Sequence, residues 1–247
     1  MIRFVTFLLC PLFFLISVEY SFGEENPSFS SAQEERGFPK VKFLLDFSDY
    51  VEGSVGDWLA VKGFKPAEGA KDRRKIDFDV NDGALIIEAK KRVRGFLINE
   101  QVDIEEFAGI RIKWGIKKYA RGANYSKGKN NEALMIYIFF GYDKISSGHF
   151  LIPNSPYFIG LYLCENEQVN TPYKGNYFHK SGRFICLGKP APGEIISSDL
   201  NLISTFKSFF EKDDVPVITG ISLAVDTTSS GDGGKATAFI RSIEFIE

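Results

Sequence analysis

The sequence predicts an all-β protein folded as an antiparallel β-sandwich, and three observations lead to this class. Short apolar segments of strand length recur along most of the chain and are separated by polar turns. The 24 phenylalanines among 247 residues suit a sheet-rich core, because aromatic side chains pack well on a pleated surface. A single segment has helical periodicity. Many short strands with turn signals and one helix are typical of a β-sandwich.

The strand segments follow one another from Val41 to the C-terminus. The tripeptide Asn81-Asp82-Gly83 predicts a hairpin, because Asn and Gly tolerate positive φ. Residues 109–119 alternate apolar and basic side chains, which indicates one buried face, whereas residues 133–142 are apolar on both faces and suit a central strand. Strands are expected at 41–47, 75–80, 84–91, 95–104, 109–119, 133–142, 157–164, 183–188, 217–227 and 235–246.

One short helix is expected over residues 198–212. Four apolar residues in this segment follow the helical spacing i, i+4, i+7 and i+8: Leu202, Phe206, Phe209 and Phe210. Pro216 lies just beyond the segment, where a helix would end.

The N-terminus predicts an exported protein. Residues 4–18 are almost wholly apolar, and small residues at 21 and 23 indicate a signal peptide over residues 1–23, cut between Gly23 and Glu24. The alternative is an uncleaved membrane anchor, although a bilayer span needs about 20 apolar residues. Residues 24–40 are expected to form a flexible leader to a single β-sandwich domain over residues 41–247. We therefore expect a periplasmic or secreted protein with no membrane span after signal removal.

Removal of the signal peptide takes Cys10 with it and leaves Cys164 and Cys186. These cysteines end two apolar segments, 157–164 and 183–188, which we expect to pair as a long-looped hairpin. In an oxidising compartment the two thiols can form a disulfide. The alternative is two buried reduced thiols, because the Cα separation decides between them and the sequence does not give it.

Sequence motifs for catalysis are mostly missing. The chain has no G-x-S-x-G elbow, no phosphate-cradling glycine loop and no H-E-x-x-H motif, and its two histidines lack the close spacing of a zinc site. A pair of carboxylates for glycan cleavage stays open, because their separation is a spatial property. Whether the protein is an enzyme is therefore undecided, and a non-catalytic role is favoured.

The charge balance argues against a nucleic-acid partner. The chain carries 30 Lys and Arg against 32 Asp and Glu, for a formal net charge of -2. Phosphate binding needs a concentrated basic field, which this balance does not predict. The main basic cluster, residues 90–94, is interpreted as a solvated face.

The segment from residue 142 to residue 184 mixes aromatic and amide side chains and is the candidate ligand site. The apolar faces of a sugar stack on aromatic rings while its hydroxyls need directional polar partners. The candidate ligand-binding residues of this segment are Tyr173, Asn176, Tyr177, Phe178 and His179. The alternative is that the rings fold back over the core.

The loop between the last two expected strands holds Asp226 and Asp232 among threonines, serines and glycines. Ca²⁺ takes about six to eight oxygen ligands, and these side chains offer some of them. Asp226 and Asp232 are therefore a candidate ion site, with Ca²⁺ as the candidate cofactor. The loop lacks the D-x-D-x-D pattern of a dedicated calcium loop, and Asp232-Gly233 is a turn dipeptide, so a turn is expected first.

Four passages together resemble a known family: FDVNDGALIIEAKK, then GIRIKWGIKKY with NNEALMIYIFFG, then SSDLNLISTFKSFFEKDDVPVITGISLAVDT, and finally AFIRSIEF. They are similar to the DUF3047 family of exported bacterial proteins of unknown function. The resemblance runs from about Val41 to the C-terminus. It implies a jelly-roll sandwich like those of galactose-binding and carbohydrate-binding modules, and it implies export, without a known activity.

The chain departs from this family mainly at acidic positions. The family ends its penultimate strand on D-x-D-N-T, where this chain has Asp226 followed by Thr, Thr and Ser. Asn130 and Asn131 stand where the family has acidic residues, and only Glu132 is acidic there. If these acids form a site in relatives, this chain has lost part of it.

We therefore expect an exported β-sandwich that binds a glycan or another cell-envelope component without catalysis. The alternatives are a carboxylate-dependent glycan hydrolase or lyase and a structural envelope protein without a small-molecule ligand. Exposed coplanar aromatic rings would favour binding. A concave pocket with two carboxylates and a shifted pKa would favour catalysis.

Overall fold

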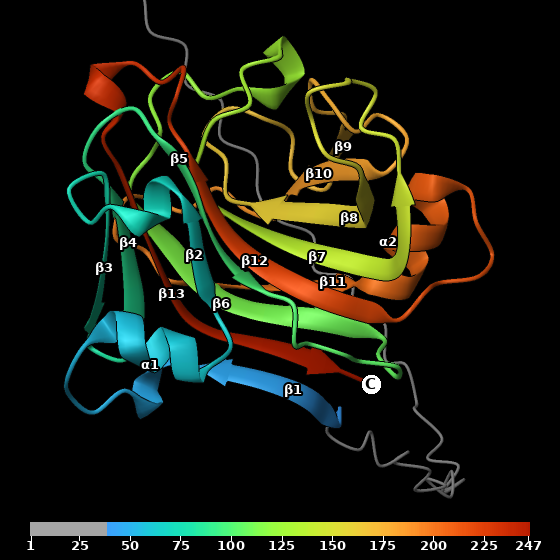
Figure 1. Cartoon of the computed structure of the whole chain (residues 1–247), viewed down its shortest axis with the longest axis horizontal. Coiled ribbons are helices and arrows are strands. Elements are labelled where there is room, and N and C mark those ends of the chain that lie inside the picture. Colours follow the sequence, from blue (N-terminus) through green and yellow to red (C-terminus); the bar gives the residue numbers. More distant parts are fainter. Residues whose placement is uncertain (1–38) are drawn as a thin grey trace, which may run out of the picture. The chain divides into compact units, whose positions relative to one another are not determined.

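The structure is a computed structural model that describes residues 39–247. The expected signal peptide and nearly all of the expected leader lie outside this range. Within it the chain forms thirteen strands, two helices and four short 3-10 turns, arranged as two layered sheets (Figure 1). The predicted all-β sandwich is confirmed. Neither helix in the described range has the length and apolar character that a membrane span requires.

The first sheet has six strands in the order β11-β6-β13-β4-β3, with β1 also paired to β13. Residues 242–246 of β13 pair with β1 and residues 236–240 pair with β4, so these two strands share one edge of β13. Its strands are β1 (Val41–Asp46), β3 (Ile76–Asn81), β4 (Ala84–Ala89), β6 (Gly109–Lys118), β11 (Ile196–Asn201) and β13 (Ala236–Ile246).

The second sheet has seven strands in the order β2-β5-β12-β7-β8-β10-β9. Its strands are β2 (Lys65–Glu68), β5 (Arg94–Asn99), β7 (Glu132–Ile145), β8 (Ser155–Tyr162), β9 (Pro172–Tyr173), β10 (Gly182–Cys186) and β12 (Ile218–Asp226). The expected hairpin between residues 157–164 and 183–188 is wrong, because β8 and β10 pair in parallel. The chain after β8 returns to the starting end of that strand and adds β9 antiparallel to β10 on the way.

Helix α2 (Leu202–Phe210) begins four residues later than expected. Residues 196–201 instead pair with β6 as strand β11. Asn201 then caps the helix, since its side chain accepts a hydrogen bond from the Ser204 amide at 2.8 Å. The apolar side of the helix is buried, and Phe206 lies 4.9 Å from Phe140 between ring centroids. The sequence did not predict the second helix, α1 (Val55–Val61), because seven residues are too few for a clear period.

The main hydrophobic core lies between the two sheets. The alternating stripe predicted for residues 109–119 faces it, and each of its four apolar side chains is at most 1% exposed: Ile110, Ile112, Trp114 and Ile116. The seven-stranded sheet also carries a second, smaller apolar cluster on its opposite face. This outer face positions the candidate site.

Candidate functional site

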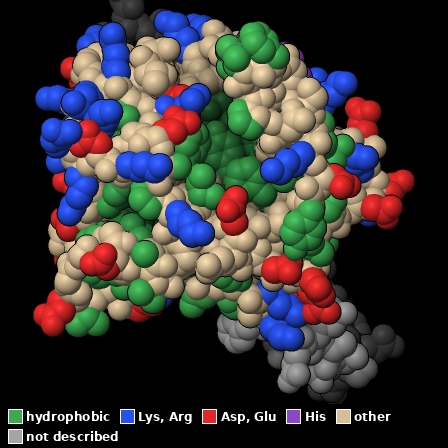
Figure 2. Space-filling model, in the orientation of Figure 1, with side chains coloured by type: hydrophobic (Ala, Val, Ile, Leu, Met, Phe, Trp, Pro, Cys, Tyr) green, Lys and Arg blue, Asp and Glu red, His purple; other side chains and the backbone are tan. Residues whose placement is uncertain are grey.

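The outer face of the seven-stranded sheet, which is turned away from the main core, has a hollow where hydrophobic side chains gather (Figure 2). Strand pairing sets the side chains of this face in rows that run across the sheet. The central row consists of Ile98, Ser222, Tyr137, Gly160, Phe184 and Tyr173. The row on one side consists of Phe96, Ala224, Met135, Tyr162 and Cys186, and the row on the other side of Gly220, Phe139, Phe158 and Gly182. Large rings therefore neighbour residues with small side chains or none, which leaves room for a hollow.

Two glycines allow the rings to lie close to the sheet. A Cβ added at Gly182 would stand 2.4 Å from Cζ of Phe158. A Cβ at Gly160 would stand 2.9 Å from Cδ1 of Phe184. Both distances are shorter than real side chains tolerate, so glycine at these positions is required by the packing of the aromatic face.

Three aromatic rings of this face are half-buried and keep part of their surface in solvent: Phe96, Tyr137 and Phe139. The Tyr137 and Phe139 rings are nearly parallel, with 17° between their planes and 6.1 Å between their centroids. Phe96 lies across β12 from them, 6.4 Å from Tyr137. Buried Phe158 packs edge-on against Tyr137 at 5.4 Å and holds its ring in place. We call Phe96, Tyr137 and Phe139 the ring platform.

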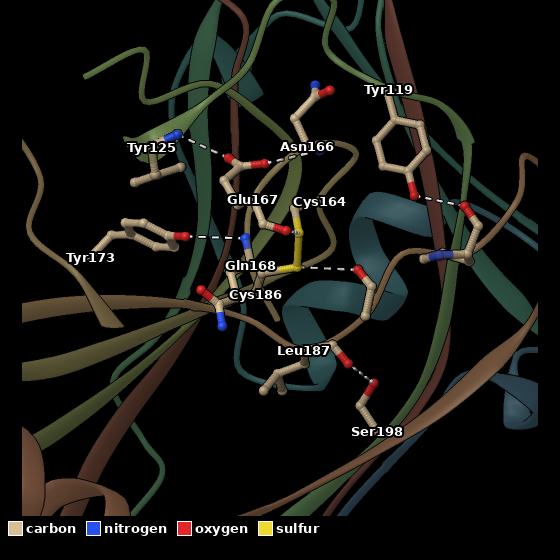
Figure 3. Close-up of a disulfide and its surroundings, with 12 residues drawn as sticks. Tyr119, Tyr125, Cys164, Asn166, Glu167, Gln168, Tyr173, Cys186, Leu187 and Ser198 are labelled. Carbon is tan, nitrogen blue, oxygen red and sulfur yellow. Dashed lines mark hydrogen bonds between the residues drawn. A yellow bond between two sulfur atoms is a disulfide. The ribbon is translucent and has the colours of Figure 1, made fainter. Parts of the chain in front are cut away.

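The sequence had pointed to the neighbouring loop instead of this platform. Tyr173 and Phe178 of that loop are half-buried and pack against the outer aromatic cluster. The Tyr173 hydroxyl accepts a hydrogen bond from the Gln168 amide at 3.1 Å (Figure 3), and the Phe178 ring lies edge-on to Phe158 at 5.4 Å. Both residues therefore border the hollow, with their rings already in contact with protein.

The other three loop residues face solvent. Asn176, Tyr177 and His179 are exposed, and Tyr177 keeps 44% of its surface accessible. The ring of Tyr177 stands edge-on to His149 at 5.6 Å. Of the five loop residues predicted from the sequence, Tyr173 and Phe178 therefore border the hollow. The other three are exposed and do not belong to the packed aromatic cluster.

A polar row closes one end of the hollow. Strand pairing sets Arg94 of β5, Asp226 of β12 and Glu132 of β7 side by side. Oδ1 of Asp226 accepts hydrogen bonds from Asn131 Nδ2 at 3.1 Å and from the amide and hydroxyl of Thr228 at 2.9 and 2.6 Å. The Asp226 carboxylate therefore already accepts three hydrogen bonds from neighbouring protein groups.

Glu132 and Asp226 are neighbouring carboxyl groups of the kind that a glycan-cleaving enzyme would need, and they differ in accessibility. Glu132 is only 4% exposed, and its Oε2 accepts a hydrogen bond from the Tyr125 hydroxyl at 2.8 Å. Burial raises the pKa of Glu132 well above its ordinary value, and the neighbouring Asp226 adds to the shift. Glu132 therefore offers almost no surface to a molecule in the hollow.

The two aspartates of the candidate ion site have separate partners. Asp232 pairs with Lys118 at 2.5 Å, and this hydrogen bond lowers the pKa of Asp232 below its ordinary value. Asp226 is bound by Asn131 and Thr228 instead. Among residues 39–247, no three His, Cys, Asp or Glu side chains are grouped to hold a metal. The predicted Ca²⁺ site stays a prediction.

A disulfide joins Cys164 and Cys186, with 5.7 Å between the Cα atoms (Figure 3). It ties the chain just after β8 to the end of β10, and both cysteines belong to the smaller apolar cluster of the outer face. Glu167, just beyond Cys164, accepts a hydrogen bond from the Tyr125 amide at 2.9 Å. The disulfide and Glu167 thus fix the loops that border the hollow.

No protein-family model and no curated protein matches this chain. Among solved structures, the carbohydrate recognition domain of Emp46p in its potassium-bound form is 10% identical, with a TM-score of 0.42 over 82% of this chain and 94% of that one. The xylan-binding module CBM86 from Roseburia intestinalis is 10% identical, with a TM-score of 0.31 over 74% and 93%. The K2 adhesin domain of Lys-gingipain is 12% identical, with a TM-score of 0.36 over 83% and 99%. Likeness at this level identifies neither a family nor a ligand.

Proposed function

We propose that this protein is a glycan-binding module and that its ligand lies in the hollow on the ring platform. The observation that carries this proposal is the pair of near-parallel rings, Tyr137 and Phe139, held half-exposed opposite Phe96. Flat apolar rings stack on the C–H faces of a sugar, while the polar row at Arg94 and Asp226 supplies charged and hydrogen-bonding groups for its substituents.

The proposed role is binding without catalysis. Of the carboxyl pair at the end of the hollow, Glu132 is buried and engaged by Tyr125. A general acid must reach the glycosidic oxygen within hydrogen-bond distance, and Glu132 lies too deep for that. The platform itself carries three aromatic rings and no carboxylate.

We also propose that the protein works outside the cytoplasm, as a periplasmic or secreted member of the DUF3047 family. A disulfide between buried cysteines supports an oxidising compartment, where such bonds persist. The apolar N-terminal segment with its signal-peptidase pattern supports the same location.

The test is binding to a glycan array, followed by affinity electrophoresis with each polysaccharide that is retained. We expect Phe96→Ala and Phe139→Ala to weaken binding about tenfold each, since an aromatic contact at the centre of a binding surface is worth roughly 1–2 kcal/mol. Phe43→Ala is the matched control, because Phe43 is a half-buried phenylalanine on β1 of the other sheet. It should bind like the unaltered protein.

The loop and the platform can be told apart in the same experiment. Tyr177→Ala removes an exposed tyrosine ring of the loop and leaves the platform residues unchanged. Loss of binding in Tyr177→Ala, with full binding in Phe96→Ala and Phe139→Ala, would move the site to the loop. Retention of no glycan at all would refute the proposed function.

A further inference from the structure

A second concavity lies at the beginning of β5, next to the hollow. Its volume is about 550 Å³, within the usual range for ligand pockets. Four cationic side chains line it together with one carboxylate and one hydroxyl: Lys75, Lys91, Arg92, Arg94, Glu68 and Thr228. A pocket with this excess of positive charge attracts anionic groups.

The fold concentrates this charge by pairing two basic segments that are separate in the sequence. The hairpin of β3 and β4 sets Ile76 opposite Ala89, and the Lys90 amide donates a hydrogen bond to the Lys75 carbonyl at 2.9 Å. The segments KDRRK (71–75) and KKRVR (90–94) therefore meet at Lys75 and Lys90. Figure 2 shows Lys and Arg side chains gathered on one side of the hollow. In a chain with a net charge of -2, this patch is a local feature and does not reflect the overall composition.

The two arginines of the pocket are held in place, whereas the two lysines are free. The Arg94 guanidinium donates two hydrogen bonds to the Glu68 carboxylate, from Nε at 2.9 Å and from Nη2 at 3.2 Å. Arg92 donates a hydrogen bond from Nε to the Ser230 carbonyl at 3.0 Å. Lys75 and Lys91 are exposed and make no ion pair with any residue in the range 39–247. Four cationic side chains line one pocket, so a bound anion would reduce the repulsion among them.

The pocket and the ring platform are continuous through β5. Arg94 and Phe96 are two residues apart on this strand and point to the same face. The Arg94 guanidinium carbon stands 6.0 Å from the centroid of the Phe96 ring. A ligand that spans both features needs an apolar face over Phe96 and an anionic group two residue spacings away along β5, at Arg94.

We propose that the pocket binds the anionic substituent of an acidic glycan, a carboxylate or a sulfate on one sugar, while the adjoining sugar lies on Phe96. This inference rests on the proposed function and adds the class of glycan. Glu68 lines the pocket and Asp226 stands beside Arg94, so a polymer with a charge on every unit, such as a nucleic acid, would meet carboxylates along its path. A glycan with more widely spaced anionic groups avoids this repulsion.

The experiment compares four probes at low and high salt: glucuronoxylan, whose carboxylates are widely spaced, a galactan with one sulfate per disaccharide, a neutral glucan and single-stranded DNA. The test variant is Lys75→Gln/Lys91→Gln, and the control is Lys189→Gln/Lys207→Gln, which removes the same charge from exposed lysines elsewhere. Phe96→Ala reports on the platform. We expect the test variant to bind one of the two acidic glycans about tenfold more weakly and the control to bind it normally. The carboxylated and sulfated probes show which anionic group the pocket takes.

Each other outcome contradicts the pocket inference, the ligand class or the proposed function. If acidic and neutral glycans bind equally, and the test variant loses nothing, the pocket inference is wrong while the proposed function stands. If single-stranded DNA binds more tightly than either acidic glycan and depends on the two lysines, the ligand class is wrong. If Phe96→Ala has no effect on any glycan, or no glycan binds, the proposed function fails and the pocket inference fails with it.

Discussion

The hydroxyl of Tyr125 donates a hydrogen bond to the carboxyl of Glu132 at 2.8 Å, beneath the polar end of the outer face. Both side chains are buried, and burial first, then the neighbouring Asp226, raises the pKa of Glu132. In the unfolded chain Glu132 titrates near 4.5, whereas the folded state keeps the proton to higher pH. The free energy of unfolding therefore falls as the pH rises above about 4.5, by up to about 1.4 kcal/mol for each pH unit over which the two states differ by one proton.

We expect Glu132→Gln to remove this pH dependence. The amide keeps an acceptor for Tyr125 and cannot ionise, so the variant should lose less stability between about pH 5 and about pH 8 than the unaltered protein. Urea unfolding across this range measures the difference. Glu165→Gln, at an exposed position nearby, is the control. Parallel stability curves for Glu132→Gln and the unaltered protein would show that the Glu132 pKa is not raised.

Reduction of the Cys164–Cys186 disulfide should lower the free energy of unfolding by about 3 kcal/mol, because the cross-link closes a loop in the unfolded chain and lowers the entropy of that state. The two cysteines are 22 residues apart in sequence. Urea unfolding with and without a phosphine reductant measures the effect. The double variant Cys164→Ala/Cys186→Ala should be equally destabilised and indifferent to reductant. A reductant effect that persists in this variant would mean that the loss has another origin.

The candidate ion site gives a prediction about metal removal. Asp226 already accepts three hydrogen bonds and Asp232 is paired with Lys118, so Ca²⁺ would have to displace these donors. We expect the melting temperature to be the same in EDTA and in millimolar Ca²⁺. A rise in melting temperature with Ca²⁺ concentration would contradict this, because a ligand that binds the folded state stabilises it by mass action. Loss of that rise in Asp226→Asn would then assign the ion to the loop.

The sequence predicted the fold where local patterns determine it. Alternation around Trp114 gave the buried face of β6, and the Asn81-Asp82-Gly83 turn gave the hairpin of β3 and β4. The prediction from sequence failed where pairing between segments far apart in the chain determines the secondary structure or the strand direction. Residues 196–201 were expected to open or precede a helix, yet their pairing with β6 makes them a strand. The parallel pairing of β8 and β10 depends on the path of the loop between them, which has no periodic signature.

The site was only partly predictable for the same reason. The apolar run at 133–142 was interpreted as a strand buried on both faces, and one face of it indeed packs in the core. Its other face carries Tyr137 and Phe139 in a half-exposed hollow, because Gly160 lies in the same row as Tyr137 and Gly182 in the same row as Phe139. Only the register between strands brings these glycines beside the rings. The candidate loop could be predicted because its aromatic and amide residues are close together in the sequence. The ring platform could not, because its residues come from two strands that are far apart in the sequence.

The last prediction tests whether glycine at 182 shapes the hollow. Gly182→Ala places a Cβ 2.4 Å from the Phe158 ring, and that ring supports Tyr137 and Phe178 from below. We expect a loss of about 1–3 kcal/mol of stability, the usual range for overpacking, together with weaker glycan binding as the platform tilts. Urea unfolding and affinity electrophoresis measure the two effects.

Gly56→Ala is the matched control, and it should act in the opposite direction. Neither glycine has a positive φ, so the two substitutions differ in the space around the new methyl group and not in backbone strain. Gly56 lies in helix α1, and an added Cβ there meets nothing nearer than Oγ of Ser54 at 3.6 Å. Alanine should stabilise the helix by about 0.5–1 kcal/mol and leave binding unchanged. If Gly182→Ala is as stable as Gly56→Ala and binds as well, Phe158 has room to move, and the hollow does not depend on glycine at position 182.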